Sequence, residues 1–498
     1  MNIQDAKQEI IHTILAYTAK NSWGEYAIPT LRQRPLLLIG PPGIGKTAVM
    51  EQAARACGVG FVSYTMTHHT RQSAVGLPFI ERKQYQGQEF AVTEYTMSEI
   101  IASVFDCIEN SGCKEGLLFL DEINCVSETL APAMLQFLQN KVFGSHRLPD
   151  GWVLAAAGNP PEYNKSVREF DIATLDRLKY IEIEADYEVW RSYALEMNIH
   201  GAILAYLDTH PEYFYILKQD YKSRSFVTAR GWEDLSCLLL QYEALNLPVN
   251  ADLMKQYLHA DDLANDFSGY YHLYLTRKKT LPVSAVMSGD SDAVSVCKSL
   301  LQEGSFDEKL HLVHLMLSLL NHRIQTWTSI QEQLSQTTVL LERLSMYQKQ
   351  NHLPTPLSAV NGFLKKEKEI LAVRKEHGLS SEQELRQMQQ SLFRLQELTY
   401  QYREQTDSLH FFENCLSSEQ AKQNQEAERL LASLQICTAL LAETDGAEFT
   451  MYLSSIRQNS VVQRFLQKYP SPILKQYQEK LDFQKREDLL KKQLEALR

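Results

Sequence analysis

Long apolar runs are missing from this 498-residue chain. No uninterrupted stretch approaches the roughly 18 apolar residues that a membrane-spanning helix needs. The first ten residues, MNIQDAKQEI, also lack the basic and then apolar order of a secretory signal peptide. We therefore expect a cytoplasmic protein without membrane insertion.

Cysteine pairs of the C-x-x-C type are absent as well. The eight cysteines are scattered along the chain without such a pair, and this excludes the zinc and redox motifs built on that spacing. We expect reduced, mostly buried thiols, as is usual for cytoplasmic proteins.

Excess positive charge is the third thing the chain lacks, because its net charge is -11. Residues 351–498 contain 20 basic and 20 acidic side chains, so the acidic excess lies entirely in residues 1–350. A protein that follows a nucleic-acid track needs a basic face. We therefore expect no nucleic-acid partner. The length is enough for two or three domains at roughly 150 residues each.

Short apolar runs alternate with helical stretches over residues 1–185. Such alternation predicts an α/β domain with a mostly parallel sheet and helices on both of its faces. The expected strands are Pro35–Ile39, Phe61–Met66, Leu117–Leu120, Trp152–Ala157 and Tyr180–Ile183.

The rest of the chain is expected to be helical. Residues 186–280 contain helical segments near 187–198, 201–208, 229–244 and 250–276, and residues 281–293 have the composition of a linker. Residues 294–498 are rich in Gln, Leu and Glu. A coiled-coil-like packing seam is indicated there, because four apolar residues recur at 3–4–3 spacing. They are Leu385, Met388, Leu392 and Leu395.

A phosphate-binding loop is predicted at residues 40–47, which read GPPGIGKT and match the pattern G-x-x-x-x-G-K-T. Backbone N–H groups of such a loop curl around phosphates, and the helix that follows points its positive end at them. Lys46 supplies a cation for the β- and γ-oxygens, and Thr47 offers a hydroxyl to Mg²⁺. The residues expected to contact the nucleotide are Gly40, Pro41, Pro42, Gly43, Ile44, Gly45, Lys46 and Thr47.

Two acids end the third expected strand, in the order Leu117-Leu-Phe-Leu-Asp121-Glu122. Adjacent side chains point in opposite directions on an extended strand, so the two carboxylates can serve different roles. Asp121 is expected to bind ATP-associated Mg²⁺, and Glu122 to orient and polarise the attacking water. The alternative is that the acids merely cap the next helix.

Three later polar residues are further candidates for the site. Asn159 follows the strand Trp152–Ala157, Arg177 precedes the last strand, and Arg230 opens a helix. The structural alternatives are a turn asparagine, a surface ion pair and a solvated arginine at a helix start.

In this order, the motifs GPPGIGKT, LLFLDEIN, AAAGNPPEYN, LDRL and TARGWED resemble the MoxR family, close to the dynein-related AAA+ proteins. The resemblance covers residues from about 30 to about 275. It implies an AAA+ core at 1–185 and an α-helical lid at 186–280, with ATP and Mg²⁺ as cofactors. Residues 294–498 match no motif of the family, and we expect this all-α region to bind a partner.

The resemblance also implies catalytic roles beyond that of Glu122. Asn159 would be sensor 1, and Arg230 would be sensor 2, acting from the lid. Arg177 would be the arginine finger that reaches the nucleotide of the neighbouring subunit. Arg168, in the loop before it, is a competing candidate for that finger.

A hexameric ring, a chaperone-like action on a protein client and a partner with a von Willebrand A domain are further implications of the resemblance. So are two hairpin inserts, which line the pore or its face and carry force to the client. Leu77–Thr93, with its turn at Gln86-Gly87-Gln88, fits the first insert, and Val142–Pro149 fits the second.

The leading hypothesis is therefore ATP hydrolysis coupled to client remodelling. The alternative is an ATP-gated scaffold whose C-terminal helices recruit a partner. A small-molecule kinase would not require an arginine acting on a neighbouring subunit, and we find no guanine-specific motif that would indicate a GTPase.

Overall fold

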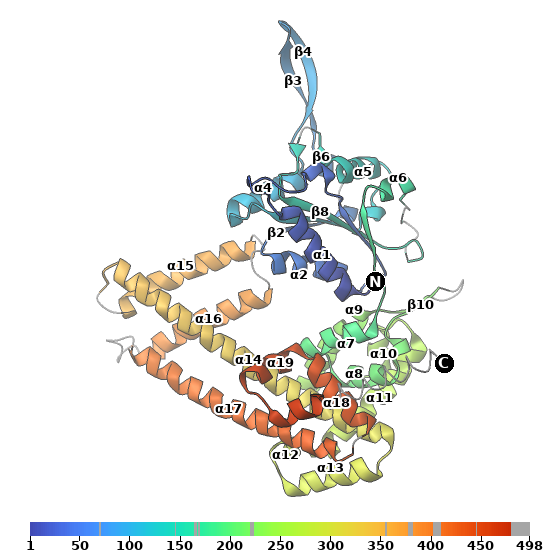
Figure 1. Ribbon diagram of the computed structural model, residues 1–498, viewed down its shortest axis with the longest axis vertical. Coiled ribbons are helices and arrows are strands. Elements are labelled where there is room, and N and C mark those ends of the chain that lie inside the picture. The colour runs from blue at the N-terminus through green and yellow to red at the C-terminus, as the bar shows by residue number, and fades with distance from the viewer. Residues whose placement is uncertain are drawn as a thin grey trace. The chain divides into compact units, whose positions relative to one another are not determined.

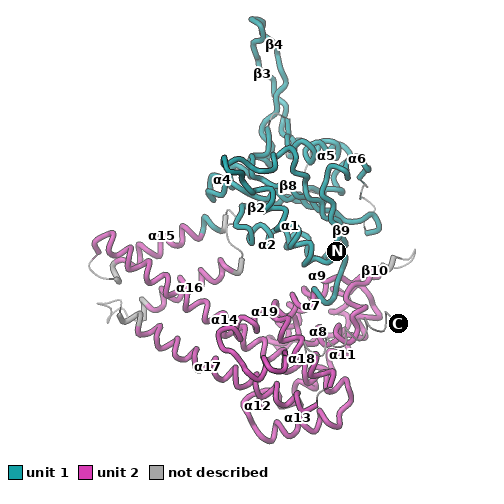
Figure 2. Tube along the Cα trace, viewed as in Figure 1, with its two compact units in different colours: residues 1–189, 372–381 teal, residues 190–371, 382–498 magenta. Residues whose placement is uncertain are grey.

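The protein is described from a computed structural model. The description covers the whole chain except residues 69–70, 145, 164–166, 168–169, 220–223, 354–355, 377–381, 402–409, 445 and 480–498. The chain divides into two compact units. Unit 1 comprises residues 1–189 with 372–381, and unit 2 comprises residues 190–371 with 382–498 (Figure 2).

Unit 1 is built on a five-stranded parallel sheet with the order β2-β5-β8-β1-β9 (Figure 1). Every strand predicted from an apolar run is confirmed, with bounds that shift by one residue. The strands are β1 (Leu36–Ile39), β2 (Gly60–Thr65), β5 (Gly116–Asp121), β8 (Trp152–Gly158) and β9 (Lys179–Glu182).

Helices cover both faces of this sheet, which explains why its central strands β1, β5 and β8 are almost entirely apolar. On one face, α1 (Ile3–Thr18) and α2 (Lys46–Cys57) pack in a core that includes Phe119. On the other face, α4 (Glu99–Ser111) and α5 (Ala131–Asn140) pack in a core that includes its neighbour Leu120. The shorter helices of the unit are η1 (Thr30–Arg32), η2 (Met66–His68), α3 (Arg71–Val75), η3 (Ile123–Cys125) and α6 (Ile172–Leu175).

Unit 1 contains two hairpins, at the places where the family resemblance implies inserts. The longer one pairs β3 (Pro78–Tyr85) with β4 (Gln88–Tyr95), and Figure 1 shows it projecting from unit 1. Both residues of its turn, Gln86 and Gly87, have positive φ, as a two-residue hairpin turn of the favoured hand requires. The shorter hairpin pairs β6 (Val142–Phe143) with β7 (His146–Arg147).

The two hairpins of unit 1 touch each other. Nε2 of His146 lies 3.2 Å from the carbonyl oxygen of Tyr95, at the end of β4. The ring of Phe143 stacks on that of Phe137 in α5, with 3.9 Å between centroids. The short hairpin therefore connects α5 to the base of the long one.

Unit 2 begins with helices in the region predicted to form a lid. The expected helix near 250–276 is wrong as a single element, because the chain is interrupted between α10 and α11. There the backbone N–H of Phe226 donates to the carbonyl of His259, and Leu258 is buried. The hairpin of β10 and β11 and the short helix η4, whose bounds follow, were not predicted. The elements are α7 (Tyr187–Glu196), α8 (Gly201–Thr209), η4 (Pro211–Tyr213), β10 (Ile216–Gln219), β11 (Arg224–Val227), α9 (Ala229–Ala244), α10 (Ala251–Lys255) and α11 (Asp261–Thr280).

The segment 281–293, expected to be a linker, contains a packed helix. Residues Val283–Met287 form α12, in which Val286 and Met287 are buried, and α13 (Ser291–Glu303) starts within the same segment. The hydroxyl of Ser433 donates to the carbonyl oxygen of Met287 over 2.8 Å. This segment is thus part of the packed body of unit 2.

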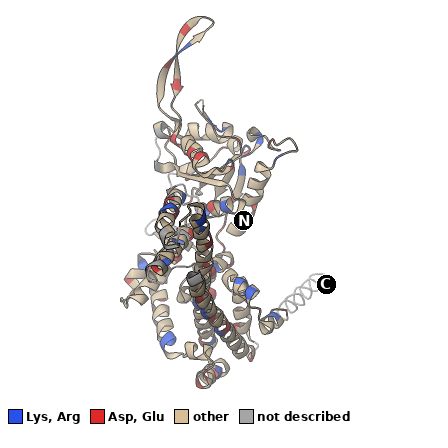
Figure 3. Ribbon diagram, turned by 90° about the vertical axis from the view of Figure 1, so that its left-hand side faces the viewer, with Lys and Arg blue, Asp and Glu red and all other residues tan. Residues whose placement is uncertain are grey.

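Long helices make up the rest of unit 2. They are α14 (Phe306–Gln350), α15 (Pro356–Glu376), α16 (Glu382–Gln401), α17 (His410–Ala442), α18 (Ala447–Gln458) and α19 (Ser460–Lys468). The seam predicted from the sequence lies on α16, where Leu385, Leu392 and Leu395 pack in one core with residues of α14. Basic and acidic side chains are mixed along these helices (Figure 3). Among the helices of the described residues, none is long and apolar enough to cross a membrane.

A buried ion pair connects the first helices of unit 2 to α18. Arg191 on α7 donates from Nε and Nη2 to both carboxylate oxygens of Asp208 on α8, over 2.6 and 3.0 Å. The same guanidinium donates to Ser455 Oγ (2.7 Å) and Gln458 Oε1 (2.8 Å) of α18. The two charged side chains are only 7% and 8% exposed. The predicted lid and the C-terminal helices therefore share one polar core.

Candidate active site

Glycines shape the loop between β1 and α2. Gly45 is the N-cap of α2. Its φ is +93°, a backbone conformation that residues other than glycine rarely adopt. No side chain caps the helix, so the first N–H groups of α2 can serve another acceptor, and a phosphate is well suited. A Cβ on Gly40 would lie 2.8 Å from the carbonyl oxygen of Ile183, so this position requires glycine too.

The Lys46 ammonium lies inside the loop that residues 40–47 form. Nζ donates to the carbonyl oxygens of Gly40 (2.7 Å) and Pro41 (2.9 Å) and to Oδ1 of Asn159 (2.9 Å). The side chain is buried. The predicted phosphate-binding lysine and the predicted sensor asparagine are thus in direct contact.

The two side chains expected to hold Mg²⁺ lie side by side. The hydroxyl of Thr47 donates to Oδ2 of Asp121 over 2.6 Å, and Oδ1 of Asp121 accepts from the backbone N–H of Glu122 over 2.9 Å. A hydroxyl and a carboxylate are the oxygen donors that Mg²⁺ prefers. The residues present therefore fit the ion.

Glu122 turns away from Asp121 directly after the end of β5. Its backbone is left-handed, with φ 55°, which costs a residue with a side chain about 1–3 kcal/mol. Its Oε2 accepts a hydrogen bond from the hydroxyl of Thr67 over 2.9 Å. The two adjacent carboxylates thus face different partners, as two separate roles require.

Asn124 is a site residue that the sequence analysis missed. Its Nδ2 donates to the carbonyl oxygen of Asn159 over 2.8 Å, and its Oδ1 accepts from the backbone N–H of the same residue over 3.3 Å. The signal in the sequence is the place of Asn124 as the last residue of the motif LLFLDEIN, two residues after Glu122.

Among the residues that the structure describes, Arg177 and Arg230 form no hydrogen bond through their side chains with this cluster. Arg177 lies between α6 and the edge strand β9 and is exposed. Its side chain forms no hydrogen bond and no ion pair with the residues that the structure describes. Arg168 lies outside the described residues. Arg230 is the second residue of α9, is exposed, and belongs to unit 2.

The carboxyl ends of the central strands therefore bring together Lys46, Thr47, Asp121, Glu122 and Asn159, together with Asn124 and Thr67. In a comparison with models of protein families, residues 35–178 match the AAA domain (dynein-related subfamily). The matched segment begins just before β1 and includes the loop, both acids, Asn159 and Arg177. No curated protein sequence matches the chain.

Proposed function

On the premise that residues 35–178 are an AAA domain of the dynein-related, MoxR-like subfamily, and hence a P-loop ATPase, we propose that ATP hydrolysis here drives the remodelling of a protein client. The active form is a ring of subunits. The observation that carries the proposal is the contact of Lys46 with Asn159 beside the Thr47–Asp121 pair. These contacts assemble phosphate-binding and water-positioning groups at one edge of the sheet.

In this proposal the N–H groups at the start of α2 and the Lys46 ammonium bind the phosphates of ATP. Thr47 and Asp121 hold Mg²⁺, which neutralises charge on the β- and γ-oxygens when bound. Glu122 accepts a hydrogen bond from the attacking water and polarises it. Asn159 holds that water in line with the γ-phosphate.

The ring is supported by the surroundings of Arg177. A long cationic side chain that is exposed at the sheet edge, and has no ion-pair partner in the described part of the chain, is available to a second subunit. There it stabilises the charge that develops on the transferred phosphoryl group. Arg230 acts on the same phosphates from unit 2.

The long hairpin is proposed to contact the client. Several large apolar side chains on it are exposed, and the rings of Tyr85 and Phe90 lie 6.1 Å apart near its turn. A two-stranded ribbon is at best marginally stable by itself in water. Aromatic side chains at its end are therefore suited to burial against another protein.

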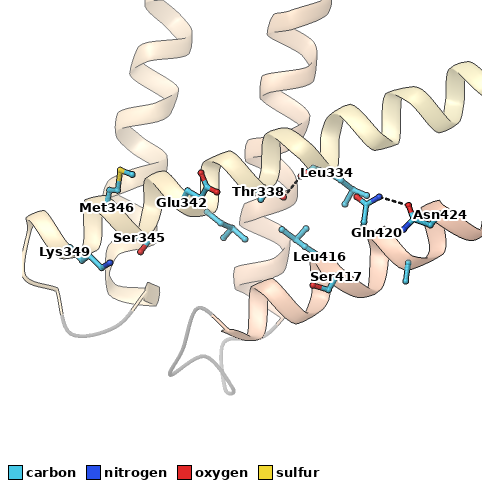
Figure 4. A pocket seen from close by; sticks show the side chains of 12 residues that line it. Leu334, Thr338, Glu342, Ser345, Met346, Lys349, Leu416, Ser417, Gln420 and Asn424 are labelled. Atoms are coloured by element: carbon cyan, nitrogen blue, oxygen red, sulfur yellow. Dashed lines mark hydrogen bonds between the residues drawn. The ribbon is translucent and has the colours of Figure 1, made fainter. Parts of the chain in front are cut away.

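A second candidate function is an ATP-gated scaffold, and one observation favours it. A groove of about 710 Å³ runs between α14 and α17, and Leu334 and Leu416 point into it from opposite sides (Figure 4). Grooves of this kind accept an amphipathic helix from another protein. In this second candidate, nucleotide controls assembly and hydrolysis is incidental. A partner with a von Willebrand A domain fits either candidate.

The mass of the protein in solution, with and without ATP and Mg²⁺, tests the proposal. Wild type should form a ring that nucleotide promotes, and Arg177→Ala should lose turnover. A monomer at all concentrations that hydrolyses ATP equally well without Arg177 would contradict the shared active site. Assembly that depends on ATP, with no effect of any client on turnover, would favour the scaffold.

A further inference from the structure

We propose that Asn124 is a positioning residue, which fixes the backbone of Asn159 so that the Asn159 side chain can act in ATP hydrolysis. This inference rests on the proposed function of the site. It assigns a role to a residue whose side chain forms two hydrogen bonds with Asn159 and, among the described residues, none with the phosphate-binding loop or with Glu122.

The two hydrogen bonds between Asn124 and Asn159, called the clamp below, lie where the sheet loses a backbone pairing. Strands β5 and β8 are paired as far as Leu120 and Ala156, and β8 continues beside β1 up to Gly158. Beyond that point β5 has turned away into η3. The carboxamide of Asn124 therefore takes the position of a neighbouring peptide group, with one donor and one acceptor directed at the same residue.

A carboxamide makes this pair of hydrogen bonds without a charge and from two separate atoms. Its NH₂ group donates and its oxygen accepts, whereas a carboxylate only accepts and an aliphatic side chain does neither. The orientation of the amide is also determined, because a flipped amide would place its oxygen against the Asn159 carbonyl. Asn124 is 5% exposed, so water cannot readily replace either bond.

Gly158 provides a second, independent observation. A Cβ at this position would lie 2.4 Å from Oδ1 and 2.7 Å from Cγ of Asn124. The absence of a side chain at Gly158 thus permits the close approach of the amide. Through the clamp, the loop after Glu122 is tied to Asn159, whose Oδ1 in turn accepts from Lys46.

Steady-state kinetics of Asn124→Ala and Asn124→Asp, with the full-length protein, tests the assignment. Both should lower kcat by about tenfold or more, because small misplacements of positioning groups are costly. Affinity for a fluorescent ATP analogue should change by less than about threefold, since the loop itself is intact. Asn124→Asp preserves the volume of the side chain. A lower kcat in this variant would therefore come from the lost hydrogen bond and not from changed packing.

A double variant identifies the residue through which Asn124 acts. In an Asn159→Ala background, adding Asn124→Ala should lower kcat by no more than about twofold, because residues that act as one unit are not additive. Asn21→Ala is the matched control. Like Asn124, Asn21 forms two hydrogen bonds with the backbone of unit 1, although it accepts both, from the N–H groups of Trp23 and Glu25. Its loss should lower thermal stability with kcat unchanged.

Wild-type kcat in Asn124→Asp, or a further large loss in the double variant, would overturn the assignment. Weakened nucleotide affinity with unchanged kcat would overturn it as well. If Asn159→Ala and Glu122→Gln both kept wild-type turnover, the proposed function of the site itself would fail. Both of those variants keep Asn124, so that result is distinguishable from a failure of the role assigned to Asn124.

Discussion

The hydroxyl of Thr67, just beyond the end of β2, donates a hydrogen bond of 2.9 Å to Oε2 of Glu122. While Oε2 accepts this hydrogen bond, Oε1 of Glu122 is left to accept one from the attacking water. Thr67→Val keeps the shape of the side chain and removes the donor, so we expect basal turnover to rise several-fold. Phosphate release at saturating ATP measures it. A fall in turnover would instead mean that Thr67 holds Glu122 in its working orientation.

Removing the charge of Glu122 should separate ATP binding from hydrolysis. Glu122→Gln retains the size of the side chain and loses the ability to polarise water, so turnover should fall by about 100-fold or more. Affinity for ATP should persist, because the phosphate contacts come from residues 40–47. Nucleotide titration and phosphate release on the same sample check both expectations, and near-normal turnover would remove Glu122 from its role.

Mixing two inactive variants tests whether Arg177 acts on a neighbouring subunit. Arg177→Ala lacks the finger and Glu122→Gln lacks the base, so each alone should be nearly inactive. In mixed rings, some sites combine the intact Glu122 of one subunit with the intact Arg177 of the next, and activity should reappear. Absence of rescue in verified mixed assemblies would place Arg177 within its own site or outside catalysis.

The sequence anticipated those features that depend on local pattern. The strands followed from apolar runs, since both faces of the sheet are covered. The long hairpin was expected from the resemblance to the MoxR family, and the turn at Gln86-Gly87-Gln88 fitted that expectation. The loop at 40–47 was readable because its glycines and lysine are contiguous. These features require no knowledge of which distant segments meet.

The features that the sequence did not reveal arise from long-range contacts. Asn124 meets Asn159 only because β5 and β8 are neighbours in the sheet, 35 residues apart in the chain. The interruption between α10 and α11 depends on the pairing of Phe226 with His259. The helix α12 packs against α17, which lies far along the chain. Because this contact cannot be read from residues 281–293 themselves, their composition resembled that of a linker.

Breaking the buried ion pair of unit 2 should be more harmful than replacing it. Asp208→Asn leaves the Arg191 guanidinium buried without its carboxylate, and we expect a loss of about 3–5 kcal/mol in stability. Replacing both residues with apolar ones, as in Arg191→Met with Asp208→Leu, should cost much less. The urea midpoints of the two variants provide the comparison, and equal losses would indicate that the charges themselves contribute.

Acid should destabilise the protein through His314. Burial lowers the pKa of this histidine to about 4, with Asp208 opposing the shift and Arg191 and His311 adding to it. Because the ordinary value is near 6.5, the unfolded chain binds a proton at His314 between pH 6.5 and 4, and the folded chain does not. The stability contributed by neutral His314 is present above pH 6.5 and is lost as pH falls towards 4.

The variant His314→Gln isolates this contribution. One proton bound only by the unfolded state changes stability by about 1.4 kcal/mol per pH unit. The variant should therefore show a shallower decline than wild type between pH 6.5 and 4 in urea unfolding. An identical pH dependence in the two proteins would exclude His314 as a source of acid sensitivity.

The length of α14 has a mechanical consequence. It packs against α8, α11, α16, α17, α18 and α19, and its 45 residues form one uninterrupted helix. A straight helix of this length measures about 68 Å and contains no hinge. A tilt of about 10° where it meets α8 would sweep the far end of a rigid helix of this length through about 12 Å, so small rotations at α8 would be enlarged at that end.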